Sequence, residues 1–409
     1  MMPSNTQWLI ISVKEPVMFH QTADETWLFN PNRRYIVNAN RIAPIEQFFD
    51  TVSELDGASL YNRLTAGKSI TGAKLLVERN RERGIGDLLF LTGPMGFLNH
   101  VAGSDIEIDV MAFADRGIAL THSPLIHNGC VKCGPLEYDH LRHYNYHWLI
   151  NTVTEQDMEG DQLNVYDAMY QQLGFDPAGI EAKWKRPTAT LVADDFLNLD
   201  RLYKYIWEQR KVDLRRIGYI VVAPFANASP RCLNYQRWLE IIKALSTRRP
   251  VVVVGSSSLR LPSMDMSAGD FSQHVSSTGG GVVNAVDSTT IRTLMALIAR
   301  SFCTVGLDSA PIFMAQALNV PAVSIWGTHA PGARIGYDKN MMDLAIWNQD
   351  ACQYAPCFAY GKLPEKKCPN GAQQVCCEVV ASVSVDDVLK KVDMIETASA
   401  QVGAFAPKT

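Results

Sequence analysis

The chain contains 409 residues with a formal net charge of −4, of which 47% are hydrophobic and 20% are charged. This length predicts two domains, with a third possible, and the composition is typical of soluble globular proteins. The charge argues against a general affinity for nucleic acid, although a local basic groove is compatible with it.

The first sixteen residues carry no basic segment and only a short apolar run, so we expect neither a signal peptide nor a membrane anchor. No apolar stretch approaches the length of a membrane span. The nine cysteines are an odd number. Without an export signal, we expect reduced thiols in a cytoplasmic protein.

Residues 1–73 are expected to form an amino-terminal extension that packs on the first domain. TWLFNP and RYIVNA predict short strands there, and IEQFFDTVSEL predicts a helix. A regular pattern then begins: AKLLVER predicts a buried strand, GIGD a turn, LLFLTGPMGFLNHV a helix and IEIDVMAF a second strand. This order is typical of a parallel sheet. The stretch 120–150 resembles a loop, and NVYDAMYQQLGF predicts an amphipathic helix.

A second alternating block begins near residue 216, after the charged boundary segment YIWEQRKVDLRR. Strands are predicted at RIGYIVVAPFA, RRPVVVVGSSS and FCTVGLD, and helices at NYQRWLEIIKAL and STTIRTLMALIARS. The predicted fold class is therefore α/β, with two Rossmann-like, doubly wound parallel-sheet domains that face each other across a cleft. Their bounds are 74–210 and 211–390, and residues 391–409 form a tail. Ligands of such sheets bind beyond the carboxyl ends of the strands.

The first polar turn at a strand end contains Asp87, which stands in the first turn of a helix after Gly84 and Gly86. Acids are favoured at that position as caps. The functional alternative is a general base that takes a proton from an incoming hydroxyl.

Two further turns suit an anion. Ser229 and Arg231 lie in a small polar turn before a helix, where backbone N–H groups, a hydroxyl and a guanidinium together suit a diphosphate. Asp308 and Ser309 precede Pro311 at the start of another helix, whose dipole would stabilise a leaving diphosphate. The alternatives are a surface charge for Arg231 and a well-capped buried helix for Asp308 and Ser309.

Other motifs are incomplete or ambiguous. The GKS at 67–69 lacks the glycine that a phosphate loop needs at 62, and the GxG at 84–86 lacks the third glycine of a dinucleotide fingerprint. Two clusters contain possible metal ligands. Cys130, Cys133, His140 and His143 form a weak zinc alternative. The second cluster is compatible with a metal knuckle, buried thiols or, less favourably, a disulfide; it comprises Cys352, Cys357, Cys368, Cys376 and Cys377.

Taken together, these segments resemble the ADP-heptose:lipopolysaccharide heptosyltransferase family, which has the GT-B fold. The resemblance spans roughly residues 74–390 and is strongest over 283–335, where TIRTLMALIA, VGLDSA and AQALNVPAVSIWG resemble the family's eLaaLi, vvgvDsG and aaalgvPvvalfG. RGIGDLLFLTGPMGFL resembles its opening iGDvlltlPll, and THAPGARIGY resembles its tdP loop. The cysteine-rich segment 352–377 resembles a tail seen in many members.

The resemblance implies transfer of a sugar from a nucleotide-diphosphate donor, with inversion and without an obligatory metal or other cofactor. It makes 74–210 the acceptor domain and 211–390 the donor domain. It assigns the base to Asp87 and the family's lysine to Arg231. The donor-binding residues predicted from it and from the turns are Gly86, Ser229, Gly255, Ser256, Asp308, Ser309, Ala310, Phe313 and Gly327.

Three positions depart from the family pattern. Ala310 stands where a glycine is usual, and Phe313 stands where a histidine is usual on the same helix. No acid follows Gly255 and Ser256 in the position expected to bind ribose. The donor is therefore not assumed to be a heptose, and the ring of Phe313 predicts an unusual donor.

The function predicted from the sequence is a glycosyltransferase acting on lipopolysaccharide or another surface glycan. One alternative is a virus-type transferase acting on hydroxymethylated bases in DNA, which the basic stretches ERNRER, KWKRP and EQRKVDLRR would fit; solvated surfaces explain them equally well. Another is a zinc-containing binding module without catalysis. A third is a nucleotide-sugar epimerase or hydrolase on the same fold. Sequence alone leaves the oligomeric state open.

Overall fold

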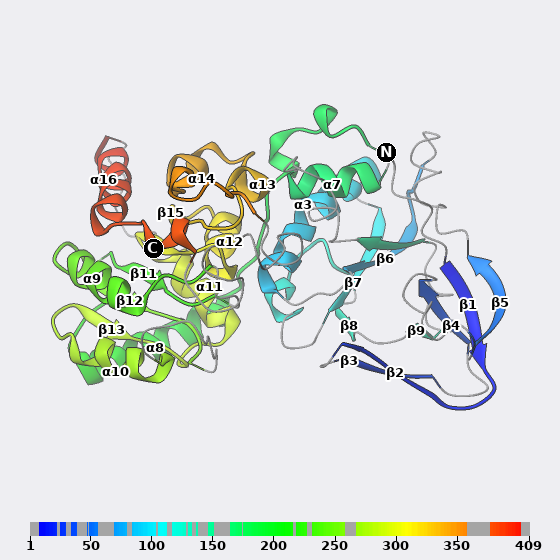
Figure 1. Ribbon diagram of the computed structural model, residues 1–409, viewed down its shortest axis with the longest axis horizontal. Coiled ribbons are helices and arrows are strands. Elements are labelled where there is room, and N and C mark those ends of the chain that lie inside the picture. Colours follow the sequence, from blue (N-terminus) through cyan, green and yellow to red (C-terminus); the bar gives the residue numbers. More distant parts are fainter. Residues whose placement is uncertain are drawn as a thin grey trace.

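The computed structural model (Figure 1) resolves the chain into two parallel-sheet units and an amino-terminal antiparallel sheet. The residues that the structure describes are 8–22, 25–29, 34–38, 47, 49–55, 69–79, 84–103, 105–112, 117–127, 130–132, 136–137, 146–150, 164–173, 175–215, 218–226, 231–257, 267–357 and 377–401. Within this part of the chain, no helix combines the length and the apolar character needed to cross a membrane.

The amino-terminal sheet has the strand order β5-β1-β4-β9 and is antiparallel. Its strands are β1 (Trp8–Val13), β4 (Arg34–Asn38), β5 (Phe49–Leu55) and β9 (Leu136–Glu137), and a separate hairpin joins β2 (Val17–Thr22) to β3 (Glu25–Phe29). The helix predicted over IEQFFDTVSEL is wrong for its second half. Residues 49–55 pair with β1, and their alternating pattern with adjacent Thr and Val suits a strand.

The first parallel sheet has the order β10-β6-β7-β8. It comprises β6 (Ala73–Arg79), β7 (Ile106–Ala112), β8 (Cys130–Lys132) and β10 (Tyr146–Ile150). The predicted strands at β6 and β7 are confirmed, as are the helices α3 (Ile85–Val101) and α7 (Val165–Gln172). The loop expected over 120–150 is wrong in part, because β8 and β10 form the two edges of this sheet and β9 joins β4. Short edge strands like these are stabilised mainly by pairing with distant segments, which local sequence does not reveal.

The second parallel sheet has six strands in the order β13-β12-β11-β14-β15-β16. In chain order they are β11 (Ile220–Ala223), β12 (Val251–Val253), β13 (Val282–Asn284), β14 (Cys303–Leu307), β15 (Ala322–Ile325) and β16 (Ala345–Ile346). The continuous burial of β11 and β12 explains their uninterrupted Val and Ile runs. The chain starts at β11, adds strands on one side and then crosses to β14 on the other. The switch point of this doubly wound sheet therefore lies between β11 and β14.

Helices cover both faces of the second sheet. One face packs against α9 (Tyr235–Ser246), α10 (Ala268–Ser277) and α16 (Val385–Gln401), which runs through the predicted boundary at residue 390. The other face packs against α11 (Ile291–Ala299) and α12 (Ala310–Ala317), with α8 (Ala193–Arg210) lying on α11. Short helices complete the described chain: α13 (Gly332–Ile335), α14 (Lys339–Asp343), α15 (Glu378–Ala381) and 3₁₀ turns at Ile118–Leu120, Pro177–Gly179, Ala182–Trp184 and Gln349–Ala351.

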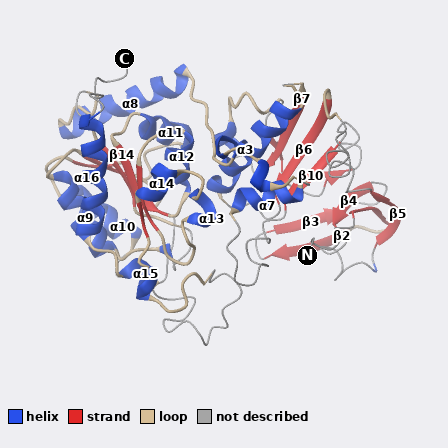
Figure 2. Ribbon diagram, turned by 90° about the horizontal axis from the view of Figure 1, so that it is seen from above, coloured by secondary structure: helices blue, strands red, loops and turns tan. Residues whose placement is uncertain are grey.

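The two parallel-sheet units share one hydrophobic core. It runs from β6, β7 and α3 through α12 and α11 to the second sheet, and α3 and α12 lie in direct contact between the units, as Figure 2 shows from above. The packing of α3 against α12 therefore fixes the position of the turn that begins α3 relative to the turn that begins α12.

Candidate functional site

Arg231 and Asp308 meet at the switch point of the second sheet. Asp308 directly follows β14, and Arg231 lies beyond the carboxyl end of β11, the parallel strand that pairs with β14. Arg231 donates from Nη1 to the Asp308 carbonyl at 2.9 Å, and the same nitrogen lies 3.8 Å from Asp308 Oδ2. The structure thus joins two residues that are 77 positions apart in sequence.

The start of α12 carries two buried oxygen atoms that have no hydrogen-bond partner among the described residues: Asp308 Oδ1 and Ser309 Oγ. Ser309 is the extended residue before the helix, yet its side chain makes no capping bond to it. Pro311 lies in the first turn, where its missing N–H costs no helical bond. Buried polar atoms are nearly always satisfied, so this helix start suits a ligand better than the simple capping alternative does.

His329 completes the buried cluster, although nothing in the sequence singled it out. It follows β15, and its Nδ1 lies 3.9 Å from Asp308 Oδ2 and 3.1 Å from Thr328 Oγ1. Burial, followed by the charges of Arg334 and Arg231, holds the pKa of His329 well below its ordinary value. The imidazole is therefore neutral near pH 7. In the sequence, the signal that could have identified His329 was its position shortly after the predicted strand that pairs with β14.

Asp87 stands in the first turn of α3, as predicted, at the edge of the first unit. Its carboxylate lies 3.8 Å from Nη1 of Arg334, which α13 of the second unit supplies. The Arg334 guanidinium also lies 5.7 Å from the centre of the Phe90 ring. Arg334 therefore brings a positive charge from the second unit to the predicted base, and sequence reasoning missed it.

Gly86 and Phe313 form the contact between α3 and α12. A Cβ atom added to Gly86 would lie 2.7 Å from Phe313 Cδ2 and 3.7 Å from the Cα atom of Ala310. The Phe313 ring is 4% exposed and packs edge-to-face against Phe90, with ring centres 4.6 Å apart, and against Trp326 at 6.4 Å. Glycine at 86 thus permits close helix approach, and Phe313 fills the shared core; its predicted contact with a donor stays a prediction.

The turn after β12 is organised by Asp287, which lies 30 residues beyond it. Gly255 adopts a φ of +140°, and a Cβ atom there would lie 2.1 Å from the Phe225 ring. Next to the half-buried Ser256, Ser257 donates from its N–H at 2.9 Å and from its hydroxyl to the Asp287 carboxylate. These bonds lower the pKa of Asp287. An acid therefore does reach this turn, from the end of β13 rather than from the expected position.

The remaining predicted residues are only partly visible. Buried Gly327 accepts a hydrogen bond from Trp347 Nε1 at 3.2 Å. Ser229, Cys133, His140 and His143 lie outside the described residues, and only the backbone of Cys130 in β8 is described. The described part of the chain contains no group of three potential metal ligands among His, Cys, Asp and Glu.

The second cysteine cluster adjoins the site. Cys352, Cys357 and Cys377 belong to the described residues, whereas Cys368 and Cys376 lie outside them. The N–H of Cys357 donates to the Thr328 carbonyl at 3.0 Å, beside His329. The backbone of Cys357 therefore supports the loop that carries His329 and Arg334.

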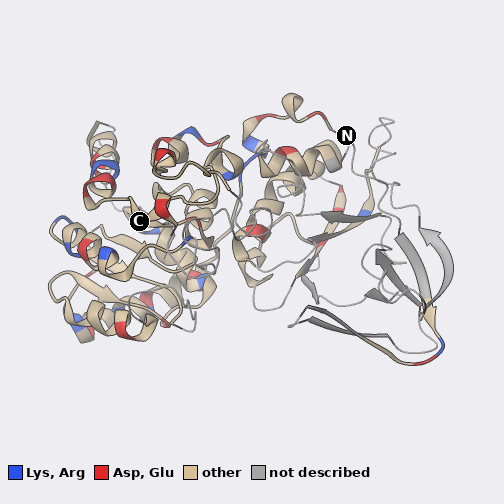
Figure 3. Cartoon of the chain, in the orientation of Figure 1, with Lys and Arg blue, Asp and Glu red and all other residues tan. Residues whose placement is uncertain are grey.

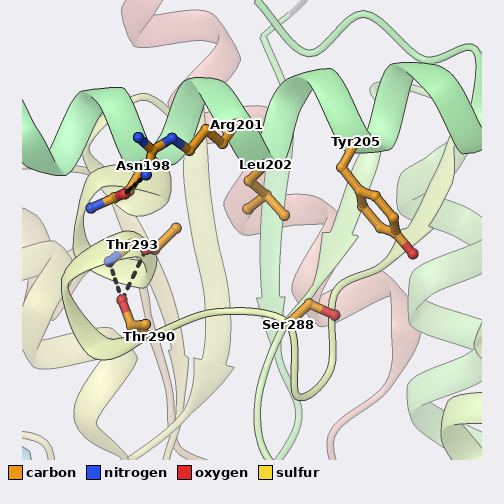
Figure 4. A pocket seen from close by; sticks show the side chains of 7 residues that line it. All are labelled: Asn198, Arg201, Leu202, Tyr205, Ser288, Thr290 and Thr293. Carbon is orange, nitrogen blue, oxygen red and sulfur yellow. Dashed lines mark hydrogen bonds between the residues drawn. The ribbon is translucent and has the colours of Figure 1, made fainter.

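A pocket of about 450 Å³ lies elsewhere, between α8 and α11 (Figure 4). Arg201 and Tyr205 of α8 face Ser288 and Thr290, which precede α11. None of the predicted site residues lines this pocket, so the argument for the site rests on its side-chain chemistry rather than on this cavity.

Three sets of contacts hold the two units in their observed arrangement. Arg292 of α11 forms a buried ion pair with Asp195 and donates to the carbonyls of Thr121 and Thr190. Lys185 lies 2.9 Å from Asp167 and above the Tyr337 ring. Arg186 donates to Asn319 Oδ1 and to the Gln316 carbonyl.

Residues 195–367 match the sequence profile of glycosyltransferase family 9 (heptosyltransferase). This segment contains Arg231, Asp308, Ser309 and Arg334, whereas Asp87 precedes it. No curated protein matches the chain.

Solved structures share the fold at low sequence identity. A family 9 glycosyl transferase from Veillonella parvula aligns with a TM-score of 0.54 and 12% identity over 81% of this chain and 99% of its own. ADP-heptose lps heptosyltransferase II from E. coli aligns with a TM-score of 0.54 and 16% identity, over 80% of this chain and 99% of its own. The iron-containing dodecameric glycosyltransferase TibC from enterotoxigenic E. coli aligns with a TM-score of 0.53 and 12% identity, over 97% of this chain and 93% of its own. The aligned part of this chain therefore includes most of the amino-terminal extension.

The profile match and the fold matches agree with the parallel-sheet units and the sequence pattern described above. The predicted GT-B architecture is confirmed by neighbours that are glycosyltransferases of this fold. The chain is therefore assigned as a glycosyltransferase, and its residues 195–367 are similar to the heptosyltransferases of family 9.

Proposed function

We propose that this glycosyltransferase moves a sugar from a nucleotide-diphosphate sugar to a hydroxyl of a lipopolysaccharide or another surface glycan, by one inverting displacement. The observation that carries the proposal is the pair of buried, unsatisfied oxygens at the start of α12, Asp308 Oδ1 and Ser309 Oγ, beside Arg231. Helix N–H groups, a hydroxyl and a guanidinium at one point suit a diphosphate. The Asp308 carboxylate suits a sugar hydroxyl.

In the proposed reaction, Asp87 takes the proton of the acceptor hydroxyl. The hydroxyl oxygen attacks the anomeric carbon from the face opposite the diphosphate, and the bond between that carbon and the phosphate oxygen breaks. Arg231, Ser309 and the N–H groups of α12 stabilise the charge that develops on the leaving diphosphate. Ser229 is proposed to contribute a further contact, and Gly255 and Ser256 are proposed to border the nucleoside.

This arrangement supplies positive charge from protein groups, so no metal ion is proposed at the reacting atoms. The TibC neighbours are iron-containing, but the described residues offer no cluster of ligands on which to place an ion here. Cytoplasmic location is part of the proposal, and it rests on the expectation from the sequence that the cysteines are reduced.

A glycan acceptor is favoured over DNA by the contacts of the basic residues. In KWKRP, Lys183 pairs with Glu181, Lys185 is buried against Asp167, and Arg186 bonds to Asn319. Figure 3 shows acidic and basic residues interspersed over the described helices instead of forming one basic track. These basic side chains make contacts within the protein, so they are not arranged to bind the phosphate backbone of DNA.

The test begins with a thermal-unfolding screen of the full chain against nucleotide sugars, because a bound donor raises the unfolding temperature. With the best donor, Asp87→Asn should lower turnover roughly 100- to 10,000-fold with little change in donor affinity. Asp194→Asn is the matched control, since Asp194 is an exposed acid in the first turn of α8. Near-normal turnover of Asp87→Asn would reject Asp87 as the base.

The charge on the donor side is tested separately. Arg231→Ala should weaken donor binding, and Arg231→Lys, which restores the residue usual in the family, should retain more of it. Donor turnover in the absence of any acceptor would instead support the epimerase or hydrolase alternative. Stoichiometric zinc without nucleotide binding would support the binding module.

A further inference from the structure

Arg334 is the charged residue of this region that the proposed reaction has not yet used. Its side chain is 12% exposed, which is unusually buried for a guanidinium. It extends from α13 of the second unit to Asp87 of the first, with 3.8 Å between Nη1 and Oδ1. The face of Phe90 lies 5.7 Å from its central carbon. The stacking ring limits the positions that the guanidinium can take.

Arg334 also lies close to the donor side of the site. It and Arg231 both act on buried His329, whose Nδ1 is 3.9 Å from the Asp308 carboxylate. The Arg231 guanidinium is bonded to the Asp308 carbonyl at the unsatisfied start of α12. The Arg334 guanidinium, whose residue follows His329 five positions later in the chain, faces Asp87.

The charge balance of the proposed transfer explains this placement. Before transfer, Asp87 is an anion and the diphosphate is esterified to the sugar. During transfer, the acceptor proton moves to Asp87, the new carbon–oxygen bond forms, and the electron pair of the broken bond goes to the diphosphate. One negative charge thus leaves Asp87 and appears on the leaving group. A cation between these positions is neutralised at both stages.

We propose that Arg334 is a second binding residue for the donor diphosphate, which exchanges its contact with Asp87 for the leaving phosphate as the charge moves. This inference rests on the proposed function. The planar guanidinium suits a phosphate because it donates two parallel hydrogen bonds. Its origin in α13 means that the contact requires the observed approach of the two units.

The experiment measures binding of nucleoside diphosphates and the matching monophosphates to the full chain by calorimetry, using ADP, UDP, GDP and CDP with AMP, UMP, GMP and CMP. Arg334→Ala should weaken the diphosphate of the preferred base by roughly 10- to 100-fold, the range of a charge-assisted contact. Binding of the monophosphate should change less than about twofold. Arg334→Lys should fall between wild type and Arg334→Ala, and it tests the charge where the alanine variant folds poorly.

Arg186→Ala is the matched control, because Arg186 also bridges the units but bonds to Gln316 and Asn319 away from Asp87. It should leave the ratio of diphosphate to monophosphate affinity unchanged. The inference is overturned if Arg334→Ala lowers turnover while both affinities stay at wild-type values, which would make Arg334 a positioning residue for Asp87. Equal weakening of both ligands in the Arg334 and Arg186 variants would also overturn it, by indicating a loosened interface.

The proposed function fails in a different way. In that case wild-type protein binds none of these nucleotides, or it binds them but transfers no sugar from any nucleotide sugar. Turnover by wild type together with unchanged diphosphate affinity in Arg334→Ala rejects only the role of Arg334.

Discussion

Replacement of Gly86 by alanine tests the contact that holds the two units together. In an isolated helix, alanine is favoured over glycine by about 1 kcal/mol. Here the added Cβ atom would lie 2.7 Å from Phe313 Cδ2 and 3.3 Å from Cε2. The ring is confined by Phe90 and Trp326. Overpacking of this kind costs about 1–3 kcal/mol, so we expect Gly86→Ala to destabilise the protein by about 1 kcal/mol.

A double-mutant cycle with Phe313→Val tests whether the Phe313 ring is the cause of the destabilisation by Gly86→Ala. Valine lacks the δ and ε atoms that the new methyl group would meet, so the clash disappears while the helix propensity of alanine remains. Gly86→Ala should therefore stabilise the Phe313→Val background by about 1 kcal/mol. The coupling energy of the cycle should then be about 1–3 kcal/mol.

The assay is urea unfolding of the four proteins, followed by tryptophan fluorescence and circular dichroism, with comparison of midpoints at equal slope. Coincident transitions by the two probes establish that one free energy describes both units. The reasoning is refuted if Gly86→Ala stabilises the wild-type background as much as the Phe313→Val background. That result would mean that α3 and α12 are not in close contact.

Three other predictions concern Asp195, His329 and the need for a metal ion. Asp195→Asn leaves Arg292 buried with its carboxylate partner lost, so unfolding free energy should fall by about 3–5 kcal/mol; a loss below about 1 kcal/mol would contradict it. Folded His329 binds fewer protons than the unfolded chain below pH 6.5, because its pKa is lowered. The free energy of unfolding should therefore decline by up to about 1.4 kcal/mol for each pH unit below that pH. Thermal unfolding at a series of pH values should show a smaller decline for a His329→Asn variant. EDTA in the transfer assay should leave turnover unchanged, since Arg231 supplies the positive charge; loss of turnover that Mg²⁺ or Mn²⁺ restores would exclude this.

Much of the fold was accessible to sequence reasoning because buried parallel strands leave a strong local pattern. Residues 251–254 are four buried valines, and residues 303–307 are buried with Thr304 as their one polar side chain. Helices α9 and α11 show apolar spacing of three and four. The errors fall where pairing is distant. Residues 49–55 were assigned to a helix, yet they pair with β1, about 40 residues earlier along the chain.

The candidate site divides in the same way. Asp87, Arg231, Asp308 and Ser309 could be proposed from the sequence because polar residues there directly follow predicted strands or begin helices. Asp287 was missed since it reaches the turn after β12 from the end of a different strand. The assignment of Phe313 to a donor site could not anticipate its packing against Gly86.

Sequence alone was enough to predict the parallel-sheet class, the resemblance to a glycosyltransferase family and the turns that carry the polar residues, because each depends on local periodicity and short motifs. The tertiary structure alone decided which turns face one another. It placed Arg231 on Asp308, His329 beside them and Arg334 against Asp87. The physical reason is that these contacts depend on the order of strands at the switch point and on the close approach of α3 to α12, which are set by packing between segments far apart in the chain.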